Sequence, residues 1–364
     1  MSNAPRMCID LGALRHNLGV VRAAAPRARV MAVIKANGYG HGMARVARAL
    51  EQADSLAVAR VGEAAALRSG GEMREIVVLE GGLSLDEILL AAELDLSLVV
   101  HHPSQLDLLC DTTLAHPLRC WLKLDTGMHR LGFPCEAFGA AWRRLAEADA
   151  VRDTPGLMTH FCCADVPDSM ATHHQIRQFQ RAVEGLPGAR SLANSAGLFG
   201  WPEAQADVVR PGIALYGVSP FDGESGAERG LRPVMTLKAP LIAINPRRAG
   251  DAIGYGGSWR CPEDMAVGVI GIGYGDGYPR HLPSGTPVRI NGVEVPLIGR
   301  VSMDMICVDL RDLPWARVGD EAVLWGEGLA VERIARQAGT IAYELLCGVA
   351  SRVATEVVDP DEEG

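Results

Sequence analysis

Short apolar runs alternate with helix-like segments over the first two thirds of the chain. Between the runs, apolar residues recur three or four positions apart, as at Met43, Val46, Ala47 and Leu50, which is the spacing of one helix face. Eight such alternations predict an α/β fold with an N-terminal TIM-like (β/α)8 barrel; an open doubly wound sheet is the alternative. No Gly-x-Gly-x-x-Gly follows the first run, which weakens the dinucleotide-binding form of that alternative. The runs are 30–34, 56–59, 76–79, 96–100, 120–124, 157–160, 191–193 and 208–213.

The pattern changes after Pro220. Residues 221–230 are rich in glycine and charge and are typical of a linker. Beyond them, short apolar runs separated by Gly and Pro predict a mostly-β domain, followed by two short helices near 331–337 and 342–346. We therefore predict a barrel over 8–228 and a C-terminal β-rich domain over 229–364, with residues 1–10 able to pack against the second. The β-like runs are 235–244, 267–272, 288–290, 293–298, 305–310 and 322–325.

Bulk composition narrows the possible partners and location. The 364 residues are 48% hydrophobic and 22% charged, which is ordinary for a globular protein of two domains. The net charge of −9, with no block of basic residues, argues against nucleic acid and against an anionic membrane as partners. No run is long enough to span a membrane and no secretory signal is visible. The nine cysteines include no Cys-x-x-Cys and no zinc pattern, so we expect reduced thiols, a cytoplasmic protein and no metal.

Polar residues follow the predicted strands at the end where a barrel active site lies. A lysine there is partly desolvated, which favours the neutral amine that can attack an aldehyde; the alternative is a solvated lysine at a strand end. The segments 194–197 and 210–213, after the seventh and eighth strands, combine a hydroxyl, a glycine and backbone N–H groups that suit a phosphate. A lysine and a phosphate pocket on one rim are what pyridoxal 5'-phosphate (PLP) requires. The strand-end residues are Lys35, Arg60, Glu80, Lys123, Asp125, His160, Asn194, Ser195 and Arg210.

Residues 35–42, Lys-Ala-Asn-Gly-Tyr-Gly-His-Gly, closely resemble the cofactor-lysine signature of the alanine racemases, PLP enzymes that interconvert L- and D-alanine. Eight further blocks follow in the family's order and extend over both domains. One block would be weak evidence, but nine in order are highly specific. The other blocks are 123–132, 160–165, 194–196, 210–217, 255–257, 271–277, 299–304 and 343–347.

The resemblance implies that Lys35 binds PLP covalently and is the base on one face of the substrate Cα. It implies that Tyr255, donated by the partner subunit, is the base on the other face, so the protein should be a homodimer with shared active sites. Racemisation needs two such groups, because a proton removed from one face is replaced from the opposite face. A phenol is a weak base near neutral pH, so nearby cations must stabilise the phenolate or the transfer must be concerted.

The resemblance also implies roles for residues around the cofactor. Arg210 would face the pyridine nitrogen and leave it unprotonated, and His160 would support Arg210. Arg130 would contact the PLP phenolic oxygen and the substrate carboxylate. Lys123 would be carbamylated to N6-carboxylysine; the alternative is an unmodified lysine paired with Asp125.

Two further sets of residues come from the resemblance. Tyr216 is expected to serve packing rather than chemistry. The cofactor set, mostly at the phosphate, comprises Tyr39, Asn194, Ser195, Gly212, Ile213 and Tyr343. The set at the substrate entrance and carboxylate, donated by the partner subunit, comprises Tyr274, Met303 and Asp304.

Other functions remain alternatives at this point. A broad-specificity amino-acid racemase stays open because Trp259 follows the Tyr255 motif where a second tyrosine is frequent. A PLP-dependent decarboxylase of the same fold is disfavoured by Met303 and Asp304, which stand where that group has a cysteine-containing motif. A PLP-binding module without turnover would look like the barrel alone. The sequence leaves open whether D-alanine would be made for the cell wall or degraded.

Overall fold

Eight parallel strands form the first sheet of the computed structural model, which describes residues 4–359. Their order is β8-β7-β6-β5-β4-β3-β2-β9. The Arg210 N–H donates to the Ala193 carbonyl (2.8 Å) and the Ser191 hydroxyl to the Val208 carbonyl (2.7 Å), which joins the two ends of the sheet. The TIM-like barrel is therefore confirmed. The strands are β2 (Arg29–Val33), β3 (Ser55–Val58), β4 (Ile76–Val78), β5 (Ser97–Val100), β6 (Arg119–Lys123), β7 (Gly156–Met158), β8 (Arg190–Ser191) and β9 (Val208–Val209).

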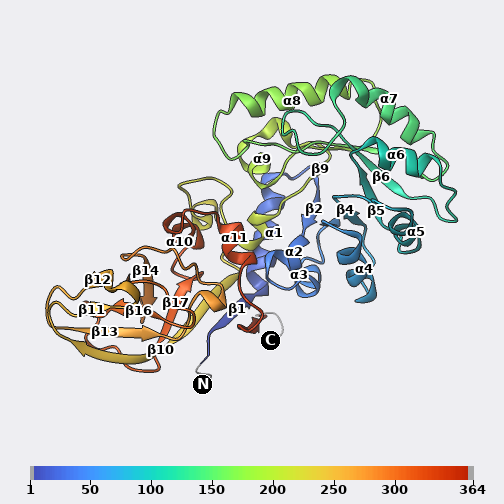
Figure 1. Cartoon of the computed structure of the whole chain (residues 1–364). Helices are drawn as coiled ribbons and strands as arrows, with labels where there is room; N and C mark the ends of the chain where they lie inside the picture. Colours follow the sequence, from blue (N-terminus) through green and yellow to red (C-terminus); the bar gives the residue numbers. More distant parts are fainter. Residues whose placement is uncertain (1–3, 360–364) are drawn as a thin grey trace.

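Helices cover the outside of this sheet (Figure 1). Their buried residues follow helical spacing, for example Thr172, Gln175, Ile176 and Phe179 of α8 (Met170–Ala182), so one face packs on the strands. All eight apolar runs correspond to strands because a strand buried on both faces is apolar at almost every position. The other barrel helices are α1 (Leu11–Ala24), α2 (Lys35–Tyr39), α3 (Met43–Ala49), α4 (Val61–Ser69), α5 (Leu85–Glu93), α6 (Pro103–Cys110), α7 (Cys135–Ala146) and α9 (Ser195–Gly200), with 3-10 turns η1 (Pro202–Ala204) and η2 (Ile213–Tyr216).

A second, mostly antiparallel sheet confirms the predicted β domain. The long strand β10 (Met235–Arg247) pairs with β17 along its first half and with β13 along its second, so six strands close into a ring. A register shift after Leu241 allows this change of partner. The other strands of this sheet include β13 (Met265–Ile270), β14 (Pro287–Ile290), β15 (Val293–Ile298), β16 (Ile306–Asp309), β17 (Glu321–Trp325) and β18 (Ala354–Val358). Strands β11 (Ala252–Ile253) and β12 (Trp259–Arg260) form a separate two-stranded sheet, and the domain also contains the 3-10 turns η4 (Tyr255–Gly257) and η5 (Tyr274–Asp276).

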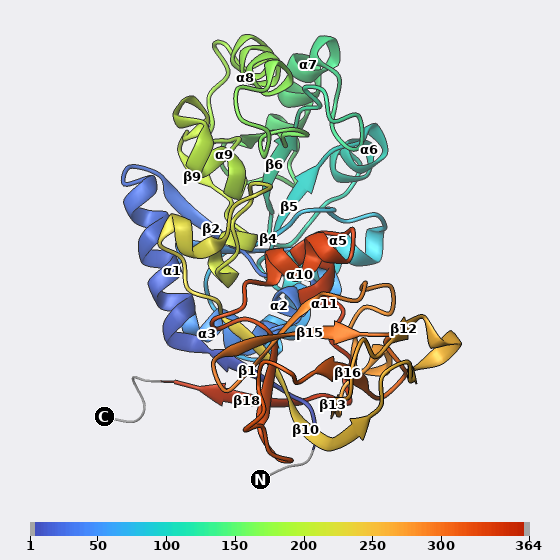
Figure 2. The same ribbon diagram turned by 90° about the vertical axis from the view of Figure 1, so that its left-hand side faces the viewer.

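The first and last strands of the chain, β1 (Arg6–Asp10) and β18, pair in this second sheet (Figure 2). Strand β1 lies between β10, to which it is antiparallel, and β18, to which it is parallel. Residues 1–3, part of the N-terminal segment expected to pack here, and 360–364 lie outside the described residues. The division of the chain at 228/229 stays a prediction.

The segment 221–230 is more ordered than a plain linker. It contains a 3-10 turn, η3 (Gly226–Arg229). The Glu332 carboxylate, on helix α10 (Val331–Gln337), accepts from the N–H groups of Ser219 (3.0 Å) and Gly226 (2.8 Å). The junction is thus bonded to the second domain.

Helix α11 (Ala342–Cys347) connects the two domains at the site (Figure 1). It packs against α2, where a Cβ on Gly40 would lie 2.2 Å from the Leu346 carbonyl oxygen. Gly40 also has a left-handed φ of 83°, so glycine is required there for two reasons. This close approach brings Tyr343, on α11, beside Tyr39, on α2. No helix within residues 4–359 has the length and apolar character needed to cross a membrane.

Candidate active site

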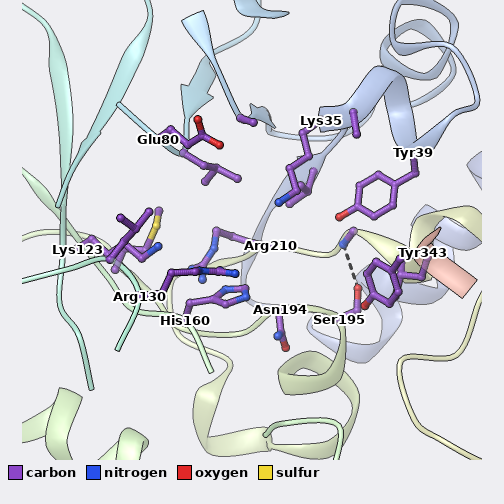
Figure 3. Close-up of a pocket in the computed structure, with 18 of the residues that line it drawn as sticks. Lys35, Tyr39, Glu80, Lys123, Arg130, His160, Asn194, Ser195, Arg210 and Tyr343 are labelled. Atoms are coloured by element: carbon purple, nitrogen blue, oxygen red, sulfur yellow. Dashed lines mark hydrogen bonds between the residues drawn. The ribbon is translucent and has the colours of Figure 1, made fainter. Parts of the chain in front are cut away.

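A left-handed turn follows β2 and aims side chains into the barrel mouth. Ala36, Asn37 and Tyr39 have φ of 51–53°, a conformation that costs a non-glycine residue about 1–2 kcal/mol. Hydrogen bonds offset this cost: the Ala36 N–H donates to Glu63, on α4 (2.8 Å), and the Met43 N–H donates to the Asn37 side chain (3.0 Å). Strained backbone of this kind is typical of functional sites. Here it sets Lys35 and Tyr39 on the same wall of one cavity (Figure 3).

The cavity has a volume of about 650 Å³ and is rich in cations. Lys35, Lys123, Arg130 and Arg210 line it, and Glu80 is the acidic residue among its lining residues. Burial, and then the neighbouring arginines and Lys35, lower the pKa of Lys123 to about 8. The same combination, with burial first, holds the pKa of His160 well below its usual range. The cavity therefore favours an anionic ligand and an imidazole that stays neutral.

Lysine is rare in this chain, which makes its placement informative. The full sequence has three lysines, Lys35, Lys123 and Lys238, and all other residues of its basic complement of 35 are arginines. Two of the three lysines line the cavity. An amine can lose its proton and act as a nucleophile or base, which a guanidinium cannot. The distribution therefore points to amine chemistry in the barrel.

Arg210 is fixed by hydrogen bonds before any ligand binds. Its guanidinium donates to the Ser191 hydroxyl (2.6 Å) and to the carbonyls of Thr159 (2.5 Å) and Leu192 (3.3 Å). Burial lowers the pKa of Arg210 to about 10, so it stays charged at neutral pH. A buried cation held by neutral acceptors is pre-oriented toward the cavity. The guanidinium donates to these three groups and not to His160.

Tyr39 and Ser195 lie across the cavity from Lys123 and Arg130 (Figure 3), and with Gly212 they form a small polar corner. The Ser195 hydroxyl accepts from the N–H groups of Gly212 (3.0 Å) and Ala214 (3.3 Å). A Cβ on Gly212 would lie 2.5 Å from the Tyr39 hydroxyl, so a side chain would fill this corner. Burial raises the pKa of Tyr39, which keeps the phenol a hydrogen-bond donor.

Two neighbouring residues serve the fold of this corner. The Asn194 side chain accepts from the Gly197 N–H (2.8 Å) and caps α9, which begins at Ser195. Tyr216 is fully buried, stacks on Tyr39 with ring centroids 4.6 Å apart, and donates to the Val33 carbonyl (3.2 Å).

Asp125 has a different partner from the one considered for it. Its carboxylate accepts from the N–H groups of Gly127, Met128 and His129 at 3.0–3.1 Å and so builds the loop after β6. Within residues 4–359, no ion pair joins it to Lys123. The amine of Lys123 is therefore surrounded mainly by other cations.

The structure brings eleven of the fifteen predicted site residues together and leaves four apart. Tyr255, Tyr274, Met303 and Asp304 lie on the β domain and do not line the cavity. Tyr255 is 68% exposed, in the turn between β11 and β12 at the outer end of that domain (Figure 1). The eleven lining residues are Lys35, Tyr39, Lys123, Arg130, His160, Asn194, Ser195, Arg210, Gly212, Ile213 and Tyr343.

Sequence reasoning missed two polar residues of the cavity wall. His101 directly follows β5, in the same strand-end position as the residues that were identified. Cys347 lies four residues after Tyr343 on α11, one helical turn away. The strand-end position of His101 and the four-residue separation of Cys347 from Tyr343 could both have been recognised in the sequence.

Comparison with known proteins agrees with this site. The family model for the alanine racemase N-terminal domain matches residues 9–220, and that for the C-terminal domain matches 234–357. Alanine racemase of Halorhodospira halophila is 52% identical over 360 residues, 99% of either chain, and that of Shewanella sediminis is 51% identical over 354 residues, 97% of this chain and 99% of the other.

Solved structures show the same relationship. The biosynthetic alanine racemase from Pseudomonas aeruginosa superposes with a TM-score of 0.95 at 43% identity, over 98% of this chain and 100% of the other. The enzyme from Acinetobacter baumannii gives a TM-score of 0.93 at 36% identity over the same shares. The chain therefore belongs to the alanine racemase family and is an amino-acid racemase, an isomerase.

Proposed function

We propose that this protein interconverts L- and D-alanine with PLP held in the barrel cavity, and that two chains share each active site. The observation that carries the proposal is the cavity, where a lysine at a strand end faces a cluster of cations and a polar corner. The names of its relatives supply the substrate. Nine free thiols accord with the reducing cytoplasm as its location.

The cavity residues fit PLP in kind. The corner at Gly212, which a Cβ would fill, offers a hydroxyl and backbone N–H groups to a phosphate, and the surrounding cations offset its charge. Lys35 supplies the amine that the aldehyde needs. When bound, PLP withdraws electrons from the substrate Cα and makes its proton acidic. Phosphate would be held by Tyr39, Ser195, Gly212, Ile213 and Tyr343, with Asn194 fixing the position of Ser195.

Arg210 would lie at the pyridine nitrogen and Arg130 at the phenolic oxygen and the substrate carboxylate. Because Arg210 is charged and anchored, it can donate a hydrogen bond but cannot accept a proton. The pyridine nitrogen would therefore stay unprotonated, and the ring would withdraw electrons from Cα only as strongly as proton exchange requires. His160, neutral and beside these cations, would support Arg210 without adding charge.

Two groups would move the proton. The Lys35 amine would take or return it on one face of Cα, and Tyr255 of the partner subunit would do so on the other face. The exposure of Tyr255 on a single chain supports donation to another chain, because a base left in water gains nothing from the barrel cations. Tyr274, Met303 and Asp304 of the partner subunit would complete the entrance and the carboxylate site.

Lys123 is proposed to react with carbon dioxide. The neutral amine attacks the carbon, one proton leaves, and the resulting carbamate carries a negative charge beside Arg130. A lysine with a pKa of about 8 has a far larger neutral fraction near neutral pH than an ordinary lysine, and the neutral amine is the reactive form. Labelled bicarbonate and carbon-13 NMR test this well, since three lysines give few signals. A spectrum with no carbamate resonance, or one kept in Lys123→Met, would reject it.

The reaction itself is tested by chiral separation of products. The PLP-loaded protein is incubated separately with L-alanine, L-serine, L-lysine and L-arginine. D-alanine as the dominant product supports the proposal. Comparable turnover of the basic amino acids would replace it with a broad-specificity racemase, and carbon dioxide without a D-isomer would indicate a decarboxylase.

A further inference from the structure

Gln175 is a buried amide outside the cavity. It lies on α8 with 1% of its surface exposed, behind the loops that follow β6 and β7. A glutamine side chain has two donor hydrogens and two acceptor lone pairs, and burial is costly unless they are used. The contacts of this side chain are therefore informative.

All four hydrogen-bonding positions of Gln175 are used. Its oxygen accepts from the N–H (3.0 Å) and the thiol (3.3 Å) of Cys162. Its nitrogen donates to the His160 carbonyl (3.1 Å) and to the Thr126 hydroxyl (3.1 Å). Three of these bonds fix the loop that carries His160. The fourth fixes the base of the loop that carries Arg130.

The bond to Thr126 continues toward Arg210. The Thr159 hydroxyl donates to the Leu124 carbonyl (2.9 Å), so it must accept from Thr126 (2.8 Å). The Thr126 hydroxyl hydrogen is then used, so its oxygen accepts from Gln175. Every hydrogen bond in this series is thus donated in the same direction, from Gln175 toward Thr159. The Thr159 carbonyl accepts from Arg210 (2.5 Å). Thr126 and Thr159 are both buried, at 1% and 0% exposure, so the chain lacks competing water.

We propose that Gln175 is a positioning residue for racemisation: its carboxamide holds the two loops that carry His160 and Arg130 in one arrangement, through the chain of hydroxyls that ends at the Arg210 acceptor. The inference rests on the proposed function, which places these two arginines and the imidazole of His160 around PLP. Gln175 touches neither cofactor nor substrate. Its effect comes through the geometry of groups that do.

The first test compares Gln175→Met with Gln178→Met. Methionine keeps the length of glutamine and removes all four bonds. Gln178 lies on the same helix and contacts His174 and Cys135 instead of the two loops. We expect kcat/KM of Gln175→Met to fall by roughly ten- to a hundredfold and its affinity for PLP to fall in parallel, since small displacements of site groups have effects of this size. The control should keep both values within about twofold.

The second test follows the loops directly. In the full-length protein, backbone amide exchange over 125–133 and 160–168 should be faster in Gln175→Met than in Gln178→Met, with or without PLP. Equal exchange, or unchanged PLP affinity and kcat/KM in folded Gln175→Met, overturns the proposal. Because the exchange measurement needs no turnover, it is interpretable even if wild-type protein does not racemise alanine, which is the outcome that rejects the proposed function.

A double-mutant cycle with Thr126→Val isolates the chain of hydroxyls. Since both substitutions break the same bond, the double variant should lose less kcat/KM than the product of the two single losses. Multiplicative losses would contradict a connected chain. Thr126→Val also carries the test if Gln175→Met does not fold, because loss of the hydroxyl should lower PLP affinity and an unchanged affinity would refute the role.

Discussion

The barrel and the β domain present their predicted site residues in opposite ways. In the barrel, Arg210 and Ser195 are buried, hydrogen-bonded and grouped around one cavity. On the β domain, Tyr255 is 68% and Met303 53% exposed, and neither reaches that cavity. Within residues 4–359, the barrel residues thus line a prepared anion pocket, whereas the β-domain set lies outside that pocket. The difference supports the proposal that the β-domain set acts on a second chain.

The largest effect is expected from the barrel half. Lys35→Ala removes both the proposed attachment point for PLP and one of the two proposed bases, so kcat/KM should fall by roughly 10^4-fold or more. The racemase assay and the visible absorbance of bound cofactor measure it. Lys238→Ala removes the lysine outside the cavity and should retain activity; a comparable loss there would contradict the distinction between the two regions.

The β-domain half should give a loss with a different signature. Tyr255→Phe should reduce racemisation by roughly 10²–10⁴-fold, the range for a proton-transfer group, and leave PLP binding intact. In D2O the variant should still exchange the Cα proton of one alanine enantiomer, because the base on the other face remains. Exchange of neither or both enantiomers would oppose two bases on opposite faces. Trp315→Phe changes another exposed aromatic of this domain and should be neutral.

A smaller effect is expected at the polar corner. Gly212→Ala places a Cβ 2.5 Å from the Tyr39 hydroxyl, and crowding of this kind costs ~1–3 kcal/mol. PLP affinity should therefore fall by about ten- to a hundredfold, as measured by titrating the PLP-free protein. Gly139→Ala, in α7 where a Cβ meets nothing within 4 Å, is the matched control. Equal affinities in the two variants would remove this corner from the phosphate site.

The smallest effect on activity is expected from Lys123 as an unmodified amine, whose charge instead makes stability depend on pH. In the folded protein the pKa of Lys123 is lowered to about 8 from its ordinary 10.5, so between these values the unfolded chain binds more protons. The free energy of unfolding should therefore rise with pH across this window, and the destabilisation present below pH 8 is lost as pH passes 10.5. Urea unfolding of PLP-free protein in carbonate-free buffer measures it. Lys123→Met should lack this contribution, and parallel profiles would contradict the crowding of cations.

The barrel could be predicted from the sequence because its strands are encoded by short, continuous segments of the chain. Buried parallel strands are apolar runs, and the polar residues directly after them meet at one end of the sheet. Strand β9 is nevertheless shorter than the run 208–213: it ends at Val209, and Arg210, Pro211 and Gly212 connect it to the 3-10 turn η2. The apolar run 208–213 predicted correctly that these residues are buried, but it did not predict where the strand ends.

Other features depend on contacts between distant segments. The left-handed conformation runs against the preference of Ala36, less so of Asn37, and the Ala36 N–H is held by Glu63, from another helix. Strand β18 is exposed at all five positions, so it has no apolar run, and pairing with β1 creates it. Gln175 is a polar residue on an amphipathic helix, and its four partners come from segments 13 to 49 residues away. The spacing of apolar and polar residues along the sequence does not predict any of these three features.

The shared site is tested most directly by mixing two inactive proteins. Lys35→Ala chains keep Tyr255, and Tyr255→Phe chains keep the complete barrel cavity, so a mixed dimer has one intact site. After dissociation and reassociation at equal concentrations, with mixed dimers purified by two different tags, activity should return to about half of the wild-type value per dimer. Confirmed mixed dimers that remain inactive would contradict a site built from two chains.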